Sequence, residues 1–590
     1  MKDKSKILSI IFSVVAGALI VAIVVGTILV CLGMRRRTYG HMRYGDIVYA
    51  RPDFDELDEA FDEAIYEAEN GSRMSAVSAM NNATTLFNEL IGALQYASIE
   101  YQKDFTDERW SGEYKAVYEQ YDKSYVDYCT MMYTALEGPN GSAIFSGYSD
   151  AEKQEIRDAY ESVTGTGNYV EYRNAIREIT AEYNALGSGS GTPVFANEVT
   201  ARNYATKAGD MLLEMAEIYN DMYSSGYAEE AYRAFGREYT PEDAEVMRDH
   251  VKEYLGGYVK ELYDSLGDEG IYIYNRVSLN DDLSGSDVVK NYLADVCSST
   301  ATDGIGEDMQ GYLTEAYDFM REYDLYYRST STKGSTGAFT TYLSMYEMPY
   351  LFQYVNGSLT ETSTFVHEFG HFSSYYINGS YGGVDLDIAE VQSQALEFMF
   401  IDRYDELYAG YTATVNGTRY DGSDIAETAA KGDLMNSLLF GVVMGCVMDE
   451  LQYDVYTNIS AYDGGADVTE KFVSVLAEYG LDEEFTARMS ADLGYGYDYF
   501  NYWWAAVSHT FEQPFYYISY AMSAVPALTI YVDSVSDFTS AAREYNYIQY
   551  YGDGSYSFED LLSLAGVSSP FAESTYEALS SYFTVISEGA

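Results

Sequence analysis

The sequence H-E-F-G-H at residues 367–371 constrains this chain more than any other short stretch. His367 and His371 stand four positions apart, so on a helix both imidazoles lie on one face and can bind one metal ion. Glu368 directly follows the first histidine and faces the same side without having to be a ligand. The chain has only five histidines, which makes a helix with two incidental histidines the weaker alternative. The motif predicts a catalytic metal site, and two imidazoles favour zinc.

A third ligand is expected downstream of the two histidines. Glu390 and Glu397 are spaced seven residues apart, on one face of a second predicted helix. Residues 378–383 are dense in turn formers, so the chain can reverse between the two helices. Catalytic zinc commonly has two imidazoles, one carboxylate and an open position for water. We predict that Glu390 is the ligand and that Glu397 orients an imidazole; a solvated or capping residue is the alternative for Glu397.

Several stretches of the chain match one family of proteins. HEFGH followed by D-x-x-E-x-x-S-Q-x-L-E, at residues 387–397, resembles the thimet oligopeptidase and oligoendopeptidase F family of zinc peptidases. The similarity continues at Lys333, Gly337-Ala338-Phe339 and residues 349–358, 446–452 and 503–521. It covers roughly residues 200 to 590, and the gap between His371 and Glu390 is shorter than is usual in the family.

The resemblance implies a mainly helical zinc-peptidase fold with a deep substrate channel and one zinc ion per chain. It also implies a small β-sheet beside the zinc helix, whose edge pairs with the backbone of the substrate. Residues 340–356 are the best strand candidate, because they are rich in Tyr, Phe and Leu with partial alternation. We expect Asn356 and Gly357, which close this strand, to contact the substrate.

A second group of catalytic side chains is expected near residue 510. In the family, a histidine followed by two tyrosines three positions apart stabilises the transition state, which points to His509, Tyr517 and Tyr520. The spacing here departs by one residue, so Tyr516 remains a candidate for this role and for substrate contact. The alternative is an aromatic helix face packed in the core.

Composition excludes several classes of function. The chain has 590 residues, 47% of them hydrophobic, which is typical of a globular protein. Its formal net charge of −58 leaves no basic surface for nucleic acid. The four cysteines are scattered without a C-x-x-C pair, so neither a disulfide framework nor a thiolate zinc site is expected.

The amino-terminal region predicts a membrane anchor. Residues 7–34 carry no charge, and a helix needs about 20 apolar residues to cross a bilayer. A secretory signal has a shorter apolar core of about 7–15 residues, so we predict an uncleaved single span preceded by a short tail, residues 1–6. Positive charges on both flanks nearly balance, slightly favouring the arginine side in the cytoplasm. The acidic, lysine-poor body favours the opposite orientation, and we expect a single-pass cell-membrane protein with an extracellular catalytic domain.

Helical periodicity dominates the body of the chain after a juxtamembrane linker at residues 35–55. Amphipathic patterns predict helices at residues 54–70, 76–101, 113–136, 151–186, 201–223, 241–266 and 307–327. The Gly-Ser stretch at 187–193 is typical of a flexible connector. We therefore predict a helical N-terminal subdomain over 56–190 and a catalytic domain over 191–590.

These features together predict a membrane-anchored zinc oligopeptidase that cuts internal bonds of short unfolded peptides, with Glu368 as general base. A zinc aminopeptidase is an alternative, although the chain has no G-x-M-E-N run to bind a free amino terminus. A non-catalytic peptide-binding or adhesive surface protein on the same scaffold is the second alternative. None of these features specifies the oligomeric state.

Overall fold

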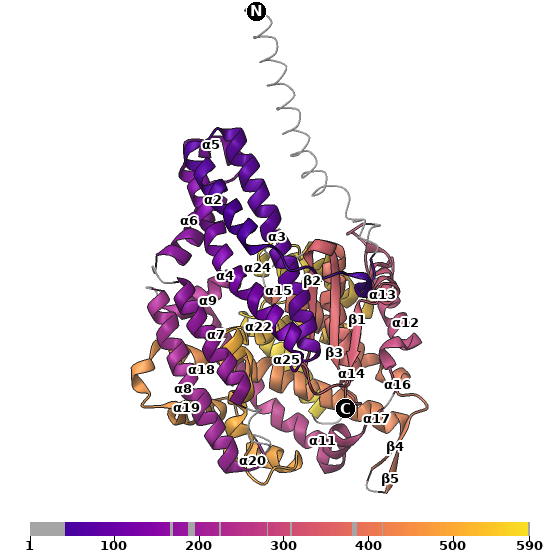
Figure 1. Ribbon diagram of the computed structural model, residues 1–590. Helices are drawn as coiled ribbons and strands as arrows, with labels where there is room; N and C mark the ends of the chain where they lie inside the picture. Colours follow the sequence, from indigo (N-terminus) through magenta and orange to yellow (C-terminus); the bar gives the residue numbers. More distant parts are fainter. Residues whose placement is uncertain are drawn as a thin grey trace, which may run out of the picture.

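The computed structural model describes residues 42–165, 169–186, 195–223, 226–279, 281–306, 309–379, 386–415 and 417–587. The predicted anchor at 7–34, its tail and the connector at 187–193 lie outside the described residues. The described chain is mainly helical with two small sheets, as the sequence predicts (Figure 1).

The first three long helices form a bundle with its own core. They are α2 (Phe54–Asn70), α3 (Arg73–Lys103) and α4 (Glu108–Glu137). Each begins after a capping residue whose side chain accepts hydrogen bonds from backbone N–H groups of the first turn; these caps are Asp53, Ser72 and Asp107. Apolar residues at helical spacing, such as Phe61, Phe87 and Val117, meet inside the bundle. In Figure 1 this bundle rises from the body as an indigo arm, ending at the short helix α5 (Gly141–Ile144).

The following helices surround the larger core. They are α6 (Asp150–Thr164), α7 (Tyr169–Leu186), α8 (Glu198–Met222), α9 (Tyr227–Ala234), α10 (Pro241–His250), α11 (Gly256–Arg276), α12 (Asp287–Val296) and α13 (Tyr312–Glu322). The single pattern predicted over 151–186 is divided between α6 and α7. Ile176, Ile179 and Tyr183 of α7 belong to the larger core and not to the core of the bundle. The predicted boundary after residue 190 remains a prediction.

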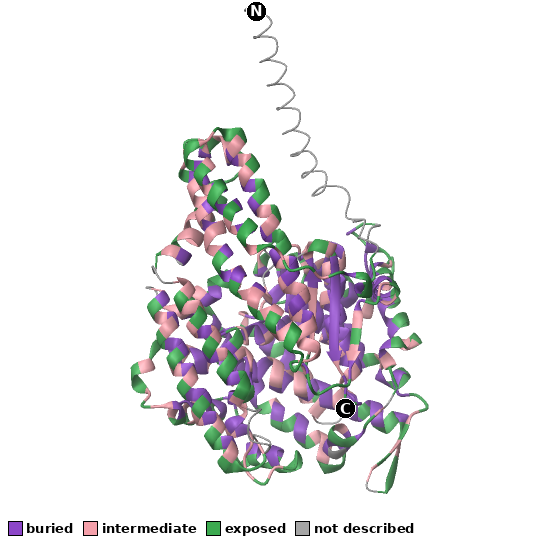
Figure 2. Cartoon of the chain, viewed as in Figure 1, coloured by how far each residue is buried: buried purple, intermediate pink, exposed green. Residues whose placement is uncertain are grey.

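A three-stranded sheet lies beside the central helices. Its strands are β1 (Tyr326–Ser329), β2 (Ala338–Leu343) and β3 (Met348–Tyr354), in the order β1-β3-β2. β1 pairs with β3 in parallel and β2 pairs with it antiparallel. Figure 2 shows that β3, the middle strand, is buried along nearly its whole length. β2 is therefore an edge strand of this sheet.

Two predictions in this region are wrong in detail. The strand predicted over 340–356 is a hairpin, because the chain reverses at a turn over Ser344–Tyr346 and Glu347 adopts a left-handed conformation with φ 49°. The helix predicted over 307–327 ends early, and its last residues begin β1. In strands this short, the alternation of apolar and polar residues is too weak a signal to separate the strands from the flanking helices.

Beyond β3, the regular structure of the described residues is helical apart from a small hairpin of β4 (Thr412–Val415) and β5 (Thr418–Asp421). Its helices are α14 (Glu361–Asn378), α15 (Leu386–Phe400), α16 (Tyr404–Leu407), α17 (Gly422–Asn436), α18 (Met444–Thr457), α19 (Gly465–Glu478), α20 (Glu483–Asp492), α21 (His509–Glu512), α22 (Ile518–Ser536), α23 (Phe538–Tyr551), α24 (Phe558–Ala565) and α25 (Glu573–Ser587). A π-helical segment, Ser437–Val443, joins α17 to α18.

Two helical stretches among the described residues are long and apolar enough to cross a membrane. They are Gly422–Thr457 and Ile518–Ser536, and 72% of the apolar window of each is buried inside the protein. Core helices of soluble proteins have this property, so neither stretch indicates a membrane span. In the fold, α22 packs on α15, and the stretch from α17 to α18 packs on α22.

Candidate active site

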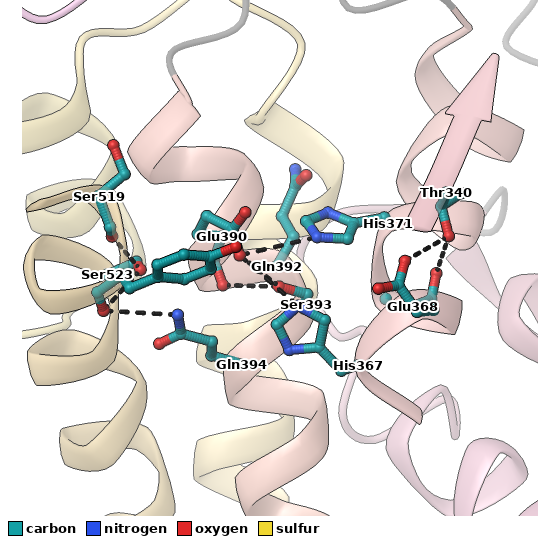
Figure 3. Close-up of polar contacts among 12 residues, drawn as sticks. Thr340, His367, Glu368, His371, Glu390, Gln392, Ser393, Gln394, Ser519 and Ser523 are labelled. Carbon is teal, nitrogen blue, oxygen red and sulfur yellow. Dashed lines mark hydrogen bonds and ion pairs between the residues drawn. The ribbon is translucent and has the colours of Figure 1, made fainter. Parts of the chain in front are cut away.

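The HEFGH sequence lies in the middle of α14, as its spacing predicts. His367 and His371 project from the same face of the helix, with ring centroids 5.2 Å apart. Figure 3 shows both rings directed toward the neighbouring helix α15. One helical turn thus places two imidazole nitrogens within reach of a single ion.

Glu390 of α15 completes a group of three ligand atoms. Its Oε2 atom lies 3.6 Å from Nε2 of His367 and 3.7 Å from Nε2 of His371. The three ligand atoms lie within 4.8 Å of one another, and no other such group occurs among the described residues. Two imidazole nitrogens and one carboxylate oxygen are a donor set that fits zinc.

The close approach of α14 and α15 depends on Gly370, the fourth residue of HEFGH. A Cβ atom at this position would lie 2.6 Å from both the Gln392 carbonyl oxygen and the Ser393 Cα atom. These contacts are with backbone, so no side-chain rotation could relieve them. A glycine costs helix stability, and here it lets the carboxylate of Glu390 reach the two imidazoles.

Further side chains hold the three candidate ligands. Oε2 of Glu397 lies 2.9 Å from Nδ1 of His367, which leaves Nε2 directed at Glu390. The hydroxyl of Tyr516 donates to Oε1 of Glu390 at 2.7 Å, and the hydroxyl of Ser393 donates to Oε2 at 3.4 Å. Burial and the charge of Glu390 raise the pKa of Tyr516 well above its ordinary value, so the hydroxyl keeps its proton. These hydrogen bonds thus fix the orientation of the Glu390 carboxylate and of the His367 ring.

The two histidines differ in the direction of their pKa shifts. Burial lowers the pKa of His367, but the hydrogen bond and charge of Glu397 outweigh burial and raise it to about 9. Burial and the charge on His367 lower the pKa of His371 well below its ordinary value. The pair therefore carries one positive charge near neutral pH, on His367.

Glu368 lies between α14 and the edge strand β2. Its side chain is 7% exposed, and the hydroxyl of Thr340 in β2 lies 2.8 Å from its Oε2 atom (Figure 3). Burial raises the pKa of Glu368 to about 7, and the charges of Glu390 and Glu397 act in the same direction. A carboxyl with such a pKa can both take and release a proton near neutral pH.

The second predicted group gathers around His509, at the start of α21. The ring centroid of His509 lies 4.8 Å from that of Tyr516, 5.8 Å from that of Tyr517 and 5.9 Å from that of Tyr520. Burial lowers the pKa of His509 to about 4, so its ring is neutral near pH 7. A cavity of about 290 Å³ opens beside it, lined by Trp503, Ala506, Val507, Ser508, His509, Tyr517 and Tyr520.

Contacts from α7 support the segment that carries His509. The hydroxyl of Tyr183 donates to the Ala505 carbonyl at 2.9 Å, and its ring stacks on Phe511 at 3.8 Å. Thr180 lies 3.2 Å from the Phe511 carbonyl, to which it donates. The short helix α21 has only one turn of its own, so these contacts fix its position.

The structure brings most of the predicted residues together. His367, His371, Glu390, Glu397 and Tyr516 are joined through the contacts above, Glu368 lies next to His367 in α14 with its carboxyl on Thr340, and Tyr517 and Tyr520 surround His509. Asn356 and Gly357 lie instead in the turn between β3 and α14, where their hydrogen bonds run to Ser358, Leu279 and Glu361. A substrate role for Asn356 and Gly357 remains a prediction.

Sequence reasoning missed Thr340 and Gly370 as parts of the site, and it missed the bond between Tyr516 and Glu390. A lone glycine inside a strong helical pattern was the available signal for Gly370. No local signal identifies Thr340 or the partner of Tyr516, because both depend on residues distant in the sequence.

The fold matches solved structures of peptidases. No family model and no curated protein matches the chain. A solved structure described as oligoendopeptidase F has a TM-score of 0.71 and 17% identity, over 93% of this chain and 99% of that one. PZ peptidase A, solved with an inhibitor, has a TM-score of 0.70 and 17% identity, over 92% of this chain and 99% of that one. A second structure described as oligoendopeptidase F, from Bacillus anthracis, has a TM-score of 0.67 and 18% identity, over 93% of this chain and 98% of that one.

These matches define the fold as the one shared by this group of helical peptidases, along almost the full length of the chain. Oligoendopeptidase F recurs among the matching structures, and the chain resembles that family, as its motifs predict.

Proposed function

We propose that this protein is a zinc metallo-oligopeptidase that hydrolyses internal bonds of short unfolded peptides. One observation carries the proposal: two imidazoles of one helix and a carboxylate of the next converge with zinc-compatible spacing, beside a buried glutamate. The names of the matching structures, oligoendopeptidase F and PZ peptidase A, support the same substrate class.

We assign the zinc site to His367, His371 and Glu390. Zinc held there would supply a Lewis acid that makes water nucleophilic at neutral pH and polarises a carbonyl group. Glu397 holds the tautomer of His367 that presents Nε2 to the ion, and Tyr516 orients the Glu390 carboxylate.

Glu368 is the proposed general base. It accepts a proton from the attacking water and delivers it to the leaving nitrogen of the cleaved bond. The Thr340 hydroxyl holds one carboxyl oxygen of Glu368, so the other oxygen is free for this transfer. Burial of this carboxyl raises its pKa, which favours the half of the cycle in which it carries the proton.

His509, Tyr517 and Tyr520 are the proposed donors to the oxyanion that forms during the reaction. Burial keeps His509 neutral and raises the pKa of Tyr517 and Tyr520 above the ordinary tyrosine value, so each retains a proton to donate. Removing one such donor typically costs about 10²–10³ in rate.

The edge strand β2 is the proposed binding site for the peptide backbone. An edge strand has backbone N–H and C=O groups that can pair with an extended chain. Thr340, a residue of this strand, contacts Glu368, so a peptide along β2 would pass the general base. Backbone pairing selects extended peptides over folded proteins and tolerates varied sequences.

We further propose that residues 7–34 anchor the protein in the cell membrane with the catalytic part outside. The support is the length and lack of charge of this stretch. Digestion of intact cells with an added protease tests the orientation: loss of the catalytic part supports it, and complete protection contradicts it.

The substitution Glu368→Gln tests the mechanism. We expect kcat on an internally quenched peptide to fall by about 10²–10⁴, the range for a general base, while the zinc content stays the same. Mass spectrometry of the products should show internal cuts. Stepwise loss of amino-terminal residues would favour an aminopeptidase, and a variant as fast as the wild type would contradict the assignment of Glu368.

A further inference from the structure

Phe515, directly before Tyr516, has an unusual backbone conformation. Its φ of 66° lies in the left-handed region, which glycine adopts readily but residues with a bulky side chain avoid, because their Cβ comes too close to the backbone. The side chain is fully buried, with ring centroids of Tyr227, Tyr232 and Tyr456 between 5.2 and 6.1 Å away. Such a conformation persists only where surrounding groups hold it, and these places are often functional.

Two buried side chains hold the Phe515 peptide groups from opposite ends. The Phe515 N–H donates to Oε1 of Gln452 in α18 at 2.9 Å. The Phe515 carbonyl accepts from Nη2 of Arg237, which lies between α9 and α10, also at 2.9 Å. Gln452 is 1% exposed and the Arg237 side chain is fully buried, so neither can exchange these bonds for water.

Arg237 also joins this turn to both neighbouring helices. The same Nη2 atom lies 2.6 Å from the hydroxyl of Ser519, in the first turn of α22. Its Nε atom lies 3.9 Å from Oδ2 of Asp387, which stands one turn before Glu390 in α15. Tyr232 and Phe235 lie beside the guanidinium, with ring centroids 4.7 and 4.8 Å away. The guanidinium therefore connects the Phe515 turn with the helix that carries Glu390.

We propose that Arg237 and Gln452 are positioning residues. Together they hold Phe515 in the left-handed conformation and thereby place the Tyr516 hydroxyl on the Glu390 carboxylate. The proposal rests on the proposed function only for the identity of the ion, zinc, and not for peptide hydrolysis. Arg237 and Gln452, although outside the metal site, would thereby contribute to the affinity of that site for zinc.

The substitution Gln452→Met tests this in the full chain purified in detergent. Methionine keeps the volume but removes the acceptor of the Phe515 N–H. We expect the zinc dissociation constant, measured against a chromophoric chelator, to rise about 10–100-fold, the usual cost of losing an outer partner of a metal ligand. Gln120→Met, which removes a buried glutamine from the bundle of α2–α4, is the matched control and should leave the constant unchanged.

The double variant Gln452→Met/Tyr516→Phe separates positioning from general destabilisation. If Gln452 acts through Tyr516, the double variant binds zinc as weakly as Tyr516→Phe alone and no more weakly. A further loss in the double variant, equal to that of Gln452→Met in the wild type, would overturn the proposal. So would an unchanged zinc affinity in Gln452→Met or a wild-type chain that does not bind zinc.

Arg237→Lys gives a second, conservative test. Lysine keeps the positive charge near Asp387, but it cannot donate to Ser519 and the Phe515 carbonyl with the fixed geometry of a guanidinium. We expect the same loss of zinc affinity, again absent in the Tyr516→Phe background. Should Gln452→Met fail to fold by circular dichroism, Arg237→Lys decides: unchanged zinc affinity overturns the proposal. Failure to cut any peptide while this zinc pattern holds would instead reject only the proposed function.

Discussion

The two halves of the candidate site are built in different ways. The half on α14 and α15 obtains its geometry from one helical turn and from one glycine between two helices. The half around His509 lies on a single-turn helix and a left-handed turn, which distant side chains hold in place. Motif spacing and one helix–helix contact therefore determine the first half, whereas several side chains distant in the sequence determine the second.

The largest expected effect comes from breaking the first half at Glu390. We expect Glu390→Ala to lose stoichiometric zinc and to reduce kcat/KM by more than the roughly 10²–10⁴ attributed to a general base, because the ion itself would be lost. Metal analysis of the purified protein measures the first effect. Glu406→Ala, at an exposed carboxylate of α16, is the control. Zinc retained at one per chain in Glu390→Ala would show that another group is the third ligand.

Breaking the second half at His509 should spare the metal. We expect His509→Ala to lower kcat by about 10²–10³ with zinc affinity unchanged, since in the proposed mechanism His509 donates to the oxyanion and does not hold the ion. Because the pKa of His509 is about 4, the ratio of wild-type to variant activity should stay constant between about pH 6 and pH 8. A ratio that changes between pH 6 and pH 8 would mean that His509 titrates in this range.

Gly370→Ala sharpens the comparison by testing the spacing of the helices. The added Cβ meets backbone atoms of α15 at 2.6 Å, so the helices must separate. We expect a loss of about 1–3 kcal/mol in the free energy of unfolding, typical of overpacking, together with weaker zinc binding. Gly112→Ala in α4, where an added Cβ meets nothing within 4 Å, is the control. Wild-type stability and zinc affinity in Gly370→Ala would show that the two helices can shift without cost.

The smallest expected effect is at Tyr183, which supports the second half from a distance. Tyr183→Phe keeps the stacking on Phe511 and removes the hydrogen bond to the Ala505 carbonyl. We expect a loss of about 1 kcal/mol in the free energy of unfolding and a lower kcat with unchanged zinc affinity. Chemical denaturation and steady-state kinetics measure the two effects. Thr130→Val in α4, which also removes one hydroxyl donor to a backbone carbonyl, is the control. An unchanged kcat in Tyr183→Phe would show that the α7 contact does not influence His509.

The difference between the halves also explains what the sequence could predict. The mainly helical fold, the resemblance and the meeting of His367, His371 and Glu390 followed from periodicity and motif spacing. The bond between Tyr516 and Glu390 could not be predicted, because it depends on the φ angle of Phe515 and on two distant side chains, Gln452 of α18 and Arg237 from the segment between α9 and α10. The hairpin of β2 and β3 was missed for a related reason: a tight reversal at Glu347 carries no glycine or asparagine to mark it.

The contact of α7 with the His509 segment has a consequence for dividing this protein. A shorter chain beginning after the Gly-Ser stretch would retain every proposed zinc ligand, yet it would lack Thr180 and Tyr183. Such a fragment should bind its cofactor and turn over poorly, so metal content would be a misleading measure of whether an expressed piece is complete. For the same reason, a chimera made from two related proteins should take α7 and the chain that follows it from the same parent.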